Sequence, residues 1–272
     1  QMQLTQEISK PKYIGYTLDL EEDHAGLLSD YYEGLNHLEE FIHIIKEKEI
    51  KLSFFVQAKI LEKFPEKIEL IRDNNFEIHL HSYSHSLQMM LDKKDTHEEI
   101  ERCKEIYHDF FGEFPKGYRF PLGVLNQNEY FILNKLGFKF DSSIFPTYRP
   151  GFFNNLSMPI KPYRVNGIIE IPFSPISKII RVPISLSYMK IFYPLHFLKS
   201  YSISPLIFDF HFHDLYNLSS TQKLTFIRKL PYIRKSKKGL NIFLKFHEKL
   251  MIKGYETVSI YEIYKKIING EI

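Results

Sequence analysis

Two hydrophobic patterns alternate along most of the chain. Short apolar runs predict β-strands at about residues 12–19, 51–56, 76–81, 116–119, 138–142, 168–172, 205–211 and 255–259. The stretches between them predict helices at about residues 31–48, 59–73, 95–111, 126–136, 221–231, 238–253 and 260–268. Alternating strands and helices are typical of an α/β fold with a mainly parallel sheet, in which site residues gather at the carboxyl ends of the strands.

Residues 144–204 interrupt this alternation. The segment is rich in proline and poor in acidic residues, and it predicts an elaborated insertion with short strands. Its second half, residues 176–204, is apolar, aromatic and basic. The simpler interpretation is an ordinary packed insertion that ends in a helix of the barrel. The other is a lid, or a surface that approaches a membrane-bound substrate.

The composition favours a single domain over residues 1–272. The chain has 44% hydrophobic and 25% charged residues, which is ordinary for a soluble globular protein. Its net charge of +3 is too small to indicate nucleic-acid binding, and its one cysteine, Cys103, excludes an internal disulfide and a cysteine-based zinc site. Neither a signal-peptide pattern nor an apolar run of ~20 residues is visible, so we expect a cytoplasmic protein, if no N-terminal signal has been trimmed before Gln1.

Pairs of chemically active side chains follow two of the predicted strands. Asp19 and Glu21 close the first strand, and side chains two apart on an extended chain point the same way. Two carboxylates directed into one site repel each other unless a cation or a proton lies between them. His81 and His85 follow the third strand, and two imidazoles four apart on a helical turn can hold one metal ion. An isolated pair of either kind is more often a solvated feature.

Three further motifs make the series specific: Tyr118–Gly123, Phe140–Ser143 and Phe208–Leu215. Taken in order, the motifs resemble those of the polysaccharide deacetylases of the NodB-homology carbohydrate esterase family, over about residues 13–215. The Asp-x-Glu form of the first motif resembles the branch that acts in bacterial surface-polysaccharide pathways. This form also departs from the more common pair of adjacent aspartates, and the chain lacks the tryptophan that the family often has.

This resemblance implies a distorted (β/α) barrel of about seven strands, elaborated by the insertion near residues 144–204. It also implies metal-dependent hydrolysis of the N-acetyl group of a sugar. Glu21, His81 and His85 would hold one divalent ion, with zinc expected, because two imidazoles and one carboxylate leave positions open for water and substrate.

The remaining motif residues take the roles that the resemblance implies. Asp19 would be the general base for the attacking water, and Arg119 would orient it. The amide of Leu122 would help to stabilise the oxyanion. His211 would protonate the leaving amine, which is a poor leaving group without a proton, and Asp141 would pair with His211.

Several alternatives stay open at this point. His213 lies two residues after His211 and is the second candidate for the general acid. The expected substrate is an N-acetylated sugar or oligosaccharide of O-antigen or capsule type, which could be lipid-linked and presented at a membrane surface. The rival activities are a deformylase acting on a lipid-linked aminosugar and a cyclic imide or ureide amidohydrolase. A carbohydrate-binding relative without turnover is the rival outside enzymes.

Overall fold

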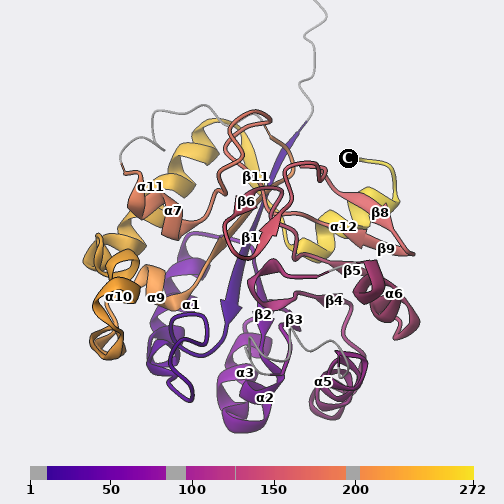
Figure 1. Cartoon of the computed structure of the whole chain (residues 1–272), viewed down its shortest axis with the longest axis horizontal. Helices are drawn as coiled ribbons and strands as arrows, with labels where there is room; N and C mark the ends of the chain where they lie inside the picture. The colour runs from indigo at the N-terminus through magenta and orange to yellow at the C-terminus, as the bar shows by residue number, and fades with distance from the viewer. Residues whose placement is uncertain (1–10, 84–95, 126, 194–202) are drawn as a thin grey trace, which may run out of the picture.

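A single curled sheet lies at the centre of the molecule, with helices packed around it (Figure 1). The structure is a computed structural model that describes residues 11–83, 96–125, 127–193 and 203–272. The sheet has nine strands, eight of them in the order β10-β1-β2-β3-β4-β5-β9-β8. The ninth, β11, pairs in parallel with the first residues of β1. Among the described strands of this sheet only the β8–β9 pair is antiparallel, so the predicted α/β class with a mainly parallel sheet is confirmed.

The strand bounds follow the apolar runs closely. They are β1 Lys12–Leu20, β2 Leu52–Val56, β3 Glu77–Leu80, β4 Gly117–Tyr118, β5 Phe140–Asp141, β6 Tyr148–Arg149, β7 Phe153–Asn154, β8 Tyr163–Val165, β9 Ile168–Glu170, β10 Leu206–Phe210 and β11 Tyr255–Thr257. The predicted insertion contains β6 to β9, and β6 pairs with β7 in a small separate hairpin. The expectation of short strands in this segment is therefore confirmed.

The helices differ from the prediction mainly where a turn divides them. They are α1 Leu38–Glu47, α2 Ala58–Lys63, α3 Pro65–Asp73, α5 Thr96–Phe111, α6 Gln127–Lys135, α7 Leu186–Ile191, α9 Phe212–Leu215, α10 Phe226–Ile233, α11 Gly239–Ile252 and α12 Ile260–Ile268. Four 3₁₀ turns join them, namely η1 Glu33–His37, η2 Pro121–Gly123, η3 Ser219–Lys223 and η4 Ser236–Lys238. The helix predicted over 59–73 breaks because Pro65 cannot continue α2 and instead begins α3.

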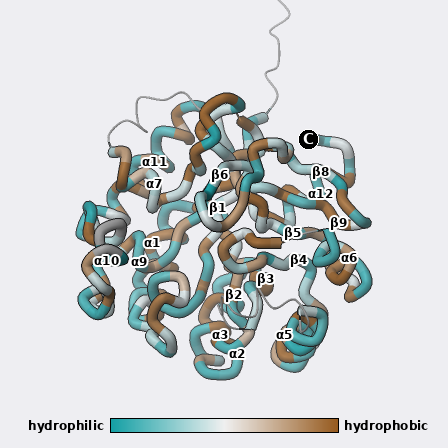
Figure 2. Tube along the Cα trace, viewed as in Figure 1, coloured by the Kyte–Doolittle hydropathy of each residue, from teal (hydrophilic) through white to brown (hydrophobic). Residues whose placement is uncertain are grey.

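Two apolar layers hold the sheet in place. Outside it, side chains such as Phe41 and Ile45 of α1 are buried against the strands. Inside the curl, Phe55 of β2 belongs to a buried cluster that also contains Ile260 and Ile263 of α12. A Cβ at Gly15 of β1 would lie 2.8 Å from Cδ1 of Ile263, so the side chains of α12 pack closely on the backbone of β1 at this position. Figure 2 shows hydrophobic positions on the central strands and hydrophilic positions on the outer turns of the helices.

The inner layer fills the end of the sheet where the strands begin. The polar motif residues lie at the opposite end, where β1, β3, β4 and β10 finish. In the part of the chain that the structure describes, no helix has the length and apolar content required to cross a bilayer.

Candidate functional site

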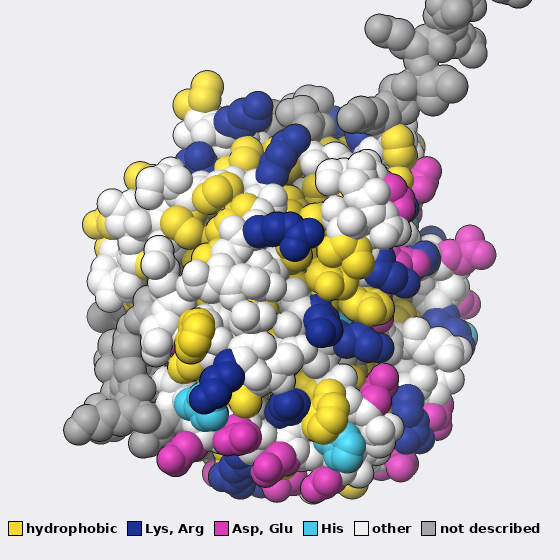
Figure 3. All heavy atoms as spheres, turned by 90° about the vertical axis from the view of Figure 1, so that its right-hand side faces the viewer, with side chains coloured by type: hydrophobic (Ala, Val, Ile, Leu, Met, Phe, Trp, Pro, Cys, Tyr) yellow, Lys and Arg dark blue, Asp and Glu magenta, His cyan; other side chains and the backbone are white. Residues whose placement is uncertain are grey.

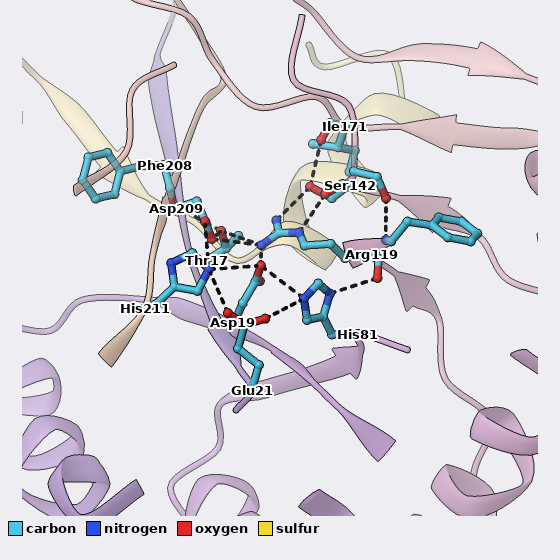
Figure 4. A network of polar contacts seen from close by, with 12 residues as sticks. Thr17, Asp19, Glu21, His81, Arg119, Ser142, Ile171, Phe208, Asp209 and His211 are labelled. Atoms are coloured by element: carbon cyan, nitrogen blue, oxygen red, sulfur yellow. Dashed lines mark hydrogen bonds and ion pairs between the residues drawn. The ribbon is translucent and has the colours of Figure 1, made fainter. Parts of the chain in front are cut away.

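Four polar side chains from three strand ends converge inside the curl of the sheet (Figure 4). Asp19 is the second-last residue of β1, and Glu21 is the first residue after that strand. His81 directly follows β3, and His211 directly follows β10. Nε2 of His81 lies 3.2 Å from Oε2 of Glu21 and 3.7 Å from Oδ2 of Asp19. Nε2 of His211 lies 3.4 Å from Oε1 of Glu21 and 3.8 Å from Oδ2 of Asp19. The two imidazoles therefore face the same two carboxylates.

The tautomer of His81 follows from the hydrogen bond that its Nδ1 makes. Nδ1 lies 3.0 Å from the carbonyl oxygen of Arg119, and a carbonyl can only accept, so Nδ1 carries the hydrogen. Nε2 is then left to face Glu21 and Asp19, where a proton or a metal ion is needed to offset the repulsion between its lone pair and the carboxylates. This donor set of imidazole nitrogen and carboxylate oxygen fits a divalent cation such as zinc. The third predicted ligand, His85, lies outside the described residues.

Other donor atoms lie close to the same place. Among the described residues, Asp19, Asp209 and His211 offer three ligand atoms within 4.8 Å of one another. His211, His213 and Asp214 also offer three such atoms within 4.8 Å of one another. From the sequence no role is assigned to Asp209 or Asp214, and the structure places both beside His211. The signal for Asp209 was its spacing, because it lies two residues before His211 and shares that side of the strand.

Arg119 is a buried side chain that holds Asp19 in place. It is 1% exposed, and its Nη1 donates to Oδ1 of Asp19 at 2.5 Å and to Oδ1 of Asp209 at 3.0 Å. Its Nε donates to the carbonyl of Ser142 at 2.7 Å, and its Nη2 to the hydroxyl of the same residue at 3.1 Å. Thr17 completes the network, since its hydroxyl donates to Oδ1 of Asp209 at 2.9 Å. The structure thus brings Arg119 and Asp19 together and leaves Oδ2 of Asp19 facing the two imidazoles.

The pKa of Asp209 reflects its burial in this network. Burial raises it to about 7, and the charge of Asp19 adds to the rise, while His211 and Arg119 partly offset it. For His211, burial alone would lower the pKa, but the carboxylates of Asp209 and Glu21 outweigh burial and raise it well above its ordinary value. A protonated His211 is therefore favoured beside these carboxylates.

The two histidines of the last motif occupy different surroundings. His211 directly follows β10 as the N-cap of α9, and His213 lies within that helix, so no single regular strand positions both rings. Their rings stack with centroids 4.7 Å apart. The backbone N–H of His24 donates to Nδ1 of His213 at 3.2 Å, and burial lowers the pKa of His213 well below its ordinary value. Of the two rings, that of His211 faces Asp19 and Glu21.

The predicted pairing of Asp141 with His211 is wrong. Asp141 is fully buried at the end of β5, where it accepts hydrogen bonds from the backbone N–H of Ser143 at 3.1 Å and from its hydroxyl at 2.8 Å. Its other close neighbour is Glu170 of β9, across the β5–β9 pair. Nδ1 of His211 instead lies 3.3 Å from Oδ2 of Asp214. The reason is the order of the strands, because β1 to β4 lie between β10 and β5 in the sheet.

Asp141 supports the turn that carries Leu122. The hydroxyl of Ser143, held by Asp141, accepts a hydrogen bond from the backbone N–H of Phe120 at 2.7 Å. Leu122 follows in η2 with a φ of 57°, in the left-handed region that residues with a Cβ rarely adopt. Such a conformation is kept only where the surrounding contacts impose it.

Sequence comparison gives a family match over part of the chain. The family model described as polysaccharide deacetylase matches residues 19–140. A peptidoglycan deacetylase of Helicobacter pylori is 25% identical over 150 residues, covering 50% of this chain and 51% of that protein. A peptidoglycan deacetylase-like protein of Gibberella zeae is 29% identical over 94 residues, covering 35% of this chain and 28% of the relative. The chain thus spans about half or less of the length of these curated relatives.

Solved structures share the fold over nearly the whole chain. A candidate polysaccharide deacetylase from Mycobacterium smegmatis superposes with a TM-score of 0.62 at 18% identity, covering 97% of this chain and 93% of that one. A protein of Bacillus anthracis described as a CE4 family pseudoenzyme superposes with a TM-score of 0.53 at 15% identity, covering 93% of this chain and 66% of that one. These likenesses show a common fold, the strongly curled and mostly parallel sheet.

Proposed function

Because the chain belongs to the polysaccharide deacetylase family, also called CE4 or NodB-homology, we propose that it hydrolyses the N-acetyl group of a sugar in a surface polysaccharide or its precursor. The observation that carries this proposal is the convergence of Asp19, Glu21, His81 and His211 around one point inside the sheet. Base, ligand and acid types are all present there, and the curated relatives are named as peptidoglycan deacetylases or a protein like them.

Glu21 and His81 would hold a divalent cation, and His85 is the proposed third ligand. We propose zinc, which takes imidazole and carboxylate ligands and tolerates an open position. A bound cation of this kind lowers the pKa of a coordinated water and polarises the amide carbonyl. The protein's part is to hold the ligands still, and the hydrogen bond from His81 to the carbonyl of Arg119 fixes the orientation of that ring.

Asp19 is the proposed general base. Arg119 holds one of its oxygens, and the other, Oδ2, faces the centre of the cluster, where it can accept a proton from the attacking water. The amide of Leu122 is the proposed donor to the oxyanion, and Asp141 maintains the turn before it through Ser143.

His211 is the proposed general acid. Its Nε2 faces the carboxylates of the cluster, and the charges of Asp209 and Glu21 favour the protonated ring. The proton on Nε2 would pass to the departing nitrogen as the C–N bond breaks, which leaves the sugar as a free amine and the acyl group as acetate. His213 accepts from a backbone N–H instead, which makes it the weaker candidate.

The insertion supports a substrate presented at an anionic surface. Glu170 is the only acidic residue in the sequence between Asp141 and Asp209, and it is fully buried. The same stretch exposes Tyr148 by 59% and Ile179 by 91%. Figure 3 shows the side of the molecule on which β8, β9, α6 and α12 lie in Figure 1; hydrophobic side chains alternate there with lysine and arginine, while aspartate and glutamate lie toward its lower and right-hand edges.

One arginine joins the two exposed parts of the insertion. Nη1 of Arg181, in the turn that carries Ile179, donates to the carbonyls of Pro146 and Met158 at 3.3 and 3.2 Å, which flank the β6–β7 hairpin. Exposed apolar residues flanked by cations suit a bilayer that contains anionic lipid. We therefore propose a lipid-linked or sugar-pyrophosphate substrate handled on the cytoplasmic side, by a protein located at the membrane periphery.

A panel of substrates tests the activity and the substrate class together. The metal-loaded protein is incubated with chitin oligomers, a nucleotide-linked or lipid-linked N-acetyl sugar, the matching N-formyl sugar, and a cyclic imide. The proposal expects the fastest acetate release from the nucleotide-linked or lipid-linked N-acetyl sugar. Activity on chitin oligomers alone would keep the chemistry and refute the precursor assignment. Activity on the N-formyl sugar or the imide alone would refute N-deacetylation.

A further inference from the structure

Asp214 is a buried carboxylate that touches His211 on the side away from the metal ligands. It is 1% exposed, and its Oδ2 accepts from Nδ1 of His211 and from the backbone N–H of the same residue, both at 3.3 Å. The residue lies one turn after His211, in α9. A carboxylate in this position can accept from Nδ1 only if that nitrogen carries a hydrogen, so it directs the other nitrogen, Nε2, toward the reacting atoms.

The other oxygen of Asp214 is held by two donors from the insertion. The hydroxyl of Ser187 donates to Oδ1 at 2.7 Å, and Nζ of Lys190 lies 3.4 Å from it. Both donors belong to α7. Lys190 is 0% exposed, and its ammonium also donates to the backbone carbonyl of Asp214 at 3.1 Å. Burial alone would raise the pKa of Asp214, but Lys190 and the bond to His211 outweigh burial and hold it below its usual range.

The backbone around Asp214 is equally constrained. A Cβ at Gly239, the first residue of α11, would overlap the backbone carbonyl oxygen of Asp214. No other residue type fits this approach, so α11 packs directly onto the peptide that carries the carboxylate. Asp214 is therefore fixed at its backbone, at Oδ1 and at Oδ2.

We propose that Asp214, anchored by Lys190, is the positioning residue for His211 in this chain. The inference rests on the proposed function for the role of His211 as general acid. It goes further in moving the supporting role from Asp141 to a residue of the same helical turn, and in making α7 of the insertion part of the catalytic apparatus.

The Asp214→Asn substitution is a sharp test because donors surround both oxygens of the carboxylate. Lys190 carries a full positive charge and can only donate, so we expect the new amide oxygen to stay at Oδ1 and the amide nitrogen to replace Oδ2. There the amide would face both the backbone N–H and Nδ1 of His211, and the neutral ring would have to move its hydrogen to Nε2 or turn away. The Asp214→Glu substitution keeps a carboxylate and provides the rescue.

The readout compares two substrates that differ in their need for an acid. An N-acetyl sugar leaves as an amine and needs a proton from His211, whereas 4-nitrophenyl acetate leaves as a stable phenolate and does not. For Asp214→Asn we expect kcat on the N-acetyl sugar to fall by about 10²–10⁴-fold, with KM and the rate on the aryl ester changed less than about threefold. Asp214→Glu should restore part of the loss. Lys190→Met should give a smaller loss of the same selective kind.

The outcomes separate this inference from the proposed function. Equal loss on both substrates, or an unchanged rate on the N-acetyl sugar, would overturn the positioning role. If the wild-type protein hydrolyses the ester but no N-acetyl sugar, the proposed function fails, and the tautomer of His211 then decides the inference. Nitrogen NMR at a pH where this ring is neutral should find the hydrogen on Nδ1 in the wild type and on Nε2 in Asp214→Asn. The same tautomer in both proteins would contradict it.

Discussion

Arg119 and Asp19, which lie 100 positions apart in the sequence, share a hydrogen bond of 2.5 Å between Nη1 and Oδ1. The same guanidinium reaches Asp209 of β10 and Ser142 after β5. One buried cation thus links strands from both halves of the curled sheet, and it stands behind the carboxylate that we propose as the base.

Removing this cation should destabilise the fold. Arg119→Met leaves Asp19 and Asp209 buried side by side without their shared partner. Breaking a buried ion pair in this way typically costs about 3–5 kcal/mol in the free energy of unfolding. Arg72→Met is the matched control, because Arg72 forms its ion pair with Asp73 at the surface. Urea titration of the metal-free proteins should show the large loss only in Arg119→Met. Equal losses in the two variants would contradict the role of Arg119 in holding Asp19 in place.

Substitutions of the neighbouring carboxylates Asp19 and Glu21 should have different effects on turnover and on zinc binding. Asp19→Asn should lower kcat by at least about 10²-fold while metal affinity largely survives, because it removes the base and not a ligand. Glu21→Gln and His81→Ala should instead weaken zinc binding by more than about 100-fold. His43→Ala, at an exposed position of α1, is the control. Titration calorimetry with zinc, run beside the activity assay, makes the comparison. Loss of zinc from Asp19→Asn and its retention in Glu21→Gln would exchange the two roles.

Stability should fall with rising pH because of the Asp141–Glu170 pair. Burial raises the pKa of Asp141 to about 6, and burial together with the charge of Asp141 raises that of Glu170 well above its usual range. The folded state therefore keeps protons that the unfolded chain loses above about pH 4, so the stability present at low pH is lost as the pH rises through about 6 and beyond.

The Glu170→Gln substitution should flatten this dependence. At about pH 4 the variant and the wild type should be similarly stable, and at about pH 8 the variant should be more stable by a few kcal/mol, since each pKa unit corresponds to about 1.4 kcal/mol. Glu69→Gln, at an exposed position of α3, serves as the control. Thermal or urea unfolding across this pH range provides the measurement. Parallel curves for Glu170→Gln and the wild type would show that the pair is not strained by its charge.

The exposed tip at Ile179 should contribute to membrane binding. In sedimentation with vesicles of phosphatidylcholine containing phosphatidylglycerol, Ile179→Asp should bind more than about 10-fold more weakly than the wild type, because it replaces an apolar contact with a negative charge. Phe131→Asp is the matched control, since Phe131 is 60% exposed on α6, outside the insertion. Binding of the wild type should also decrease with salt and be weak on pure phosphatidylcholine. Equal effects of the two substitutions would refute the assignment of this surface.

The sequence was sufficient where local pattern determines structure. The apolar run of β1 and its polar end predicted both the strand and the position of Asp19, and the order of motifs placed His81, Arg119 and His211 at the ends of parallel strands. Even the break at Pro65 had a local signal that the prediction of one helix over 59–73 overlooked.

The support around His211 was only partly signalled by the sequence. Asp214 lies three residues after His211, within local reach, but its anchoring by Lys190, 24 positions earlier in the sequence, becomes visible only in the structure. Asp141 was expected in that role because of the resemblance, but the contacts of β5 with β9 direct it to Glu170 instead. Pairings of this kind depend on which strands become neighbours, which a pattern of single residues does not encode.

The most direct test of the account measures acetate and new amine together. The zinc-loaded protein is given an N-acetylated amino-sugar substrate, beside the chelator-treated protein and the Asp19→Asn and His211→Ala variants. We predict equal amounts of acetate and free amine from the loaded wild type, none after chelation, and at least about 10²-fold slower release from both variants. Saccharide binding without any release of acetate, in the loaded wild type as in the variants, would contradict the account and identify the chain as a binding protein on a deacetylase fold.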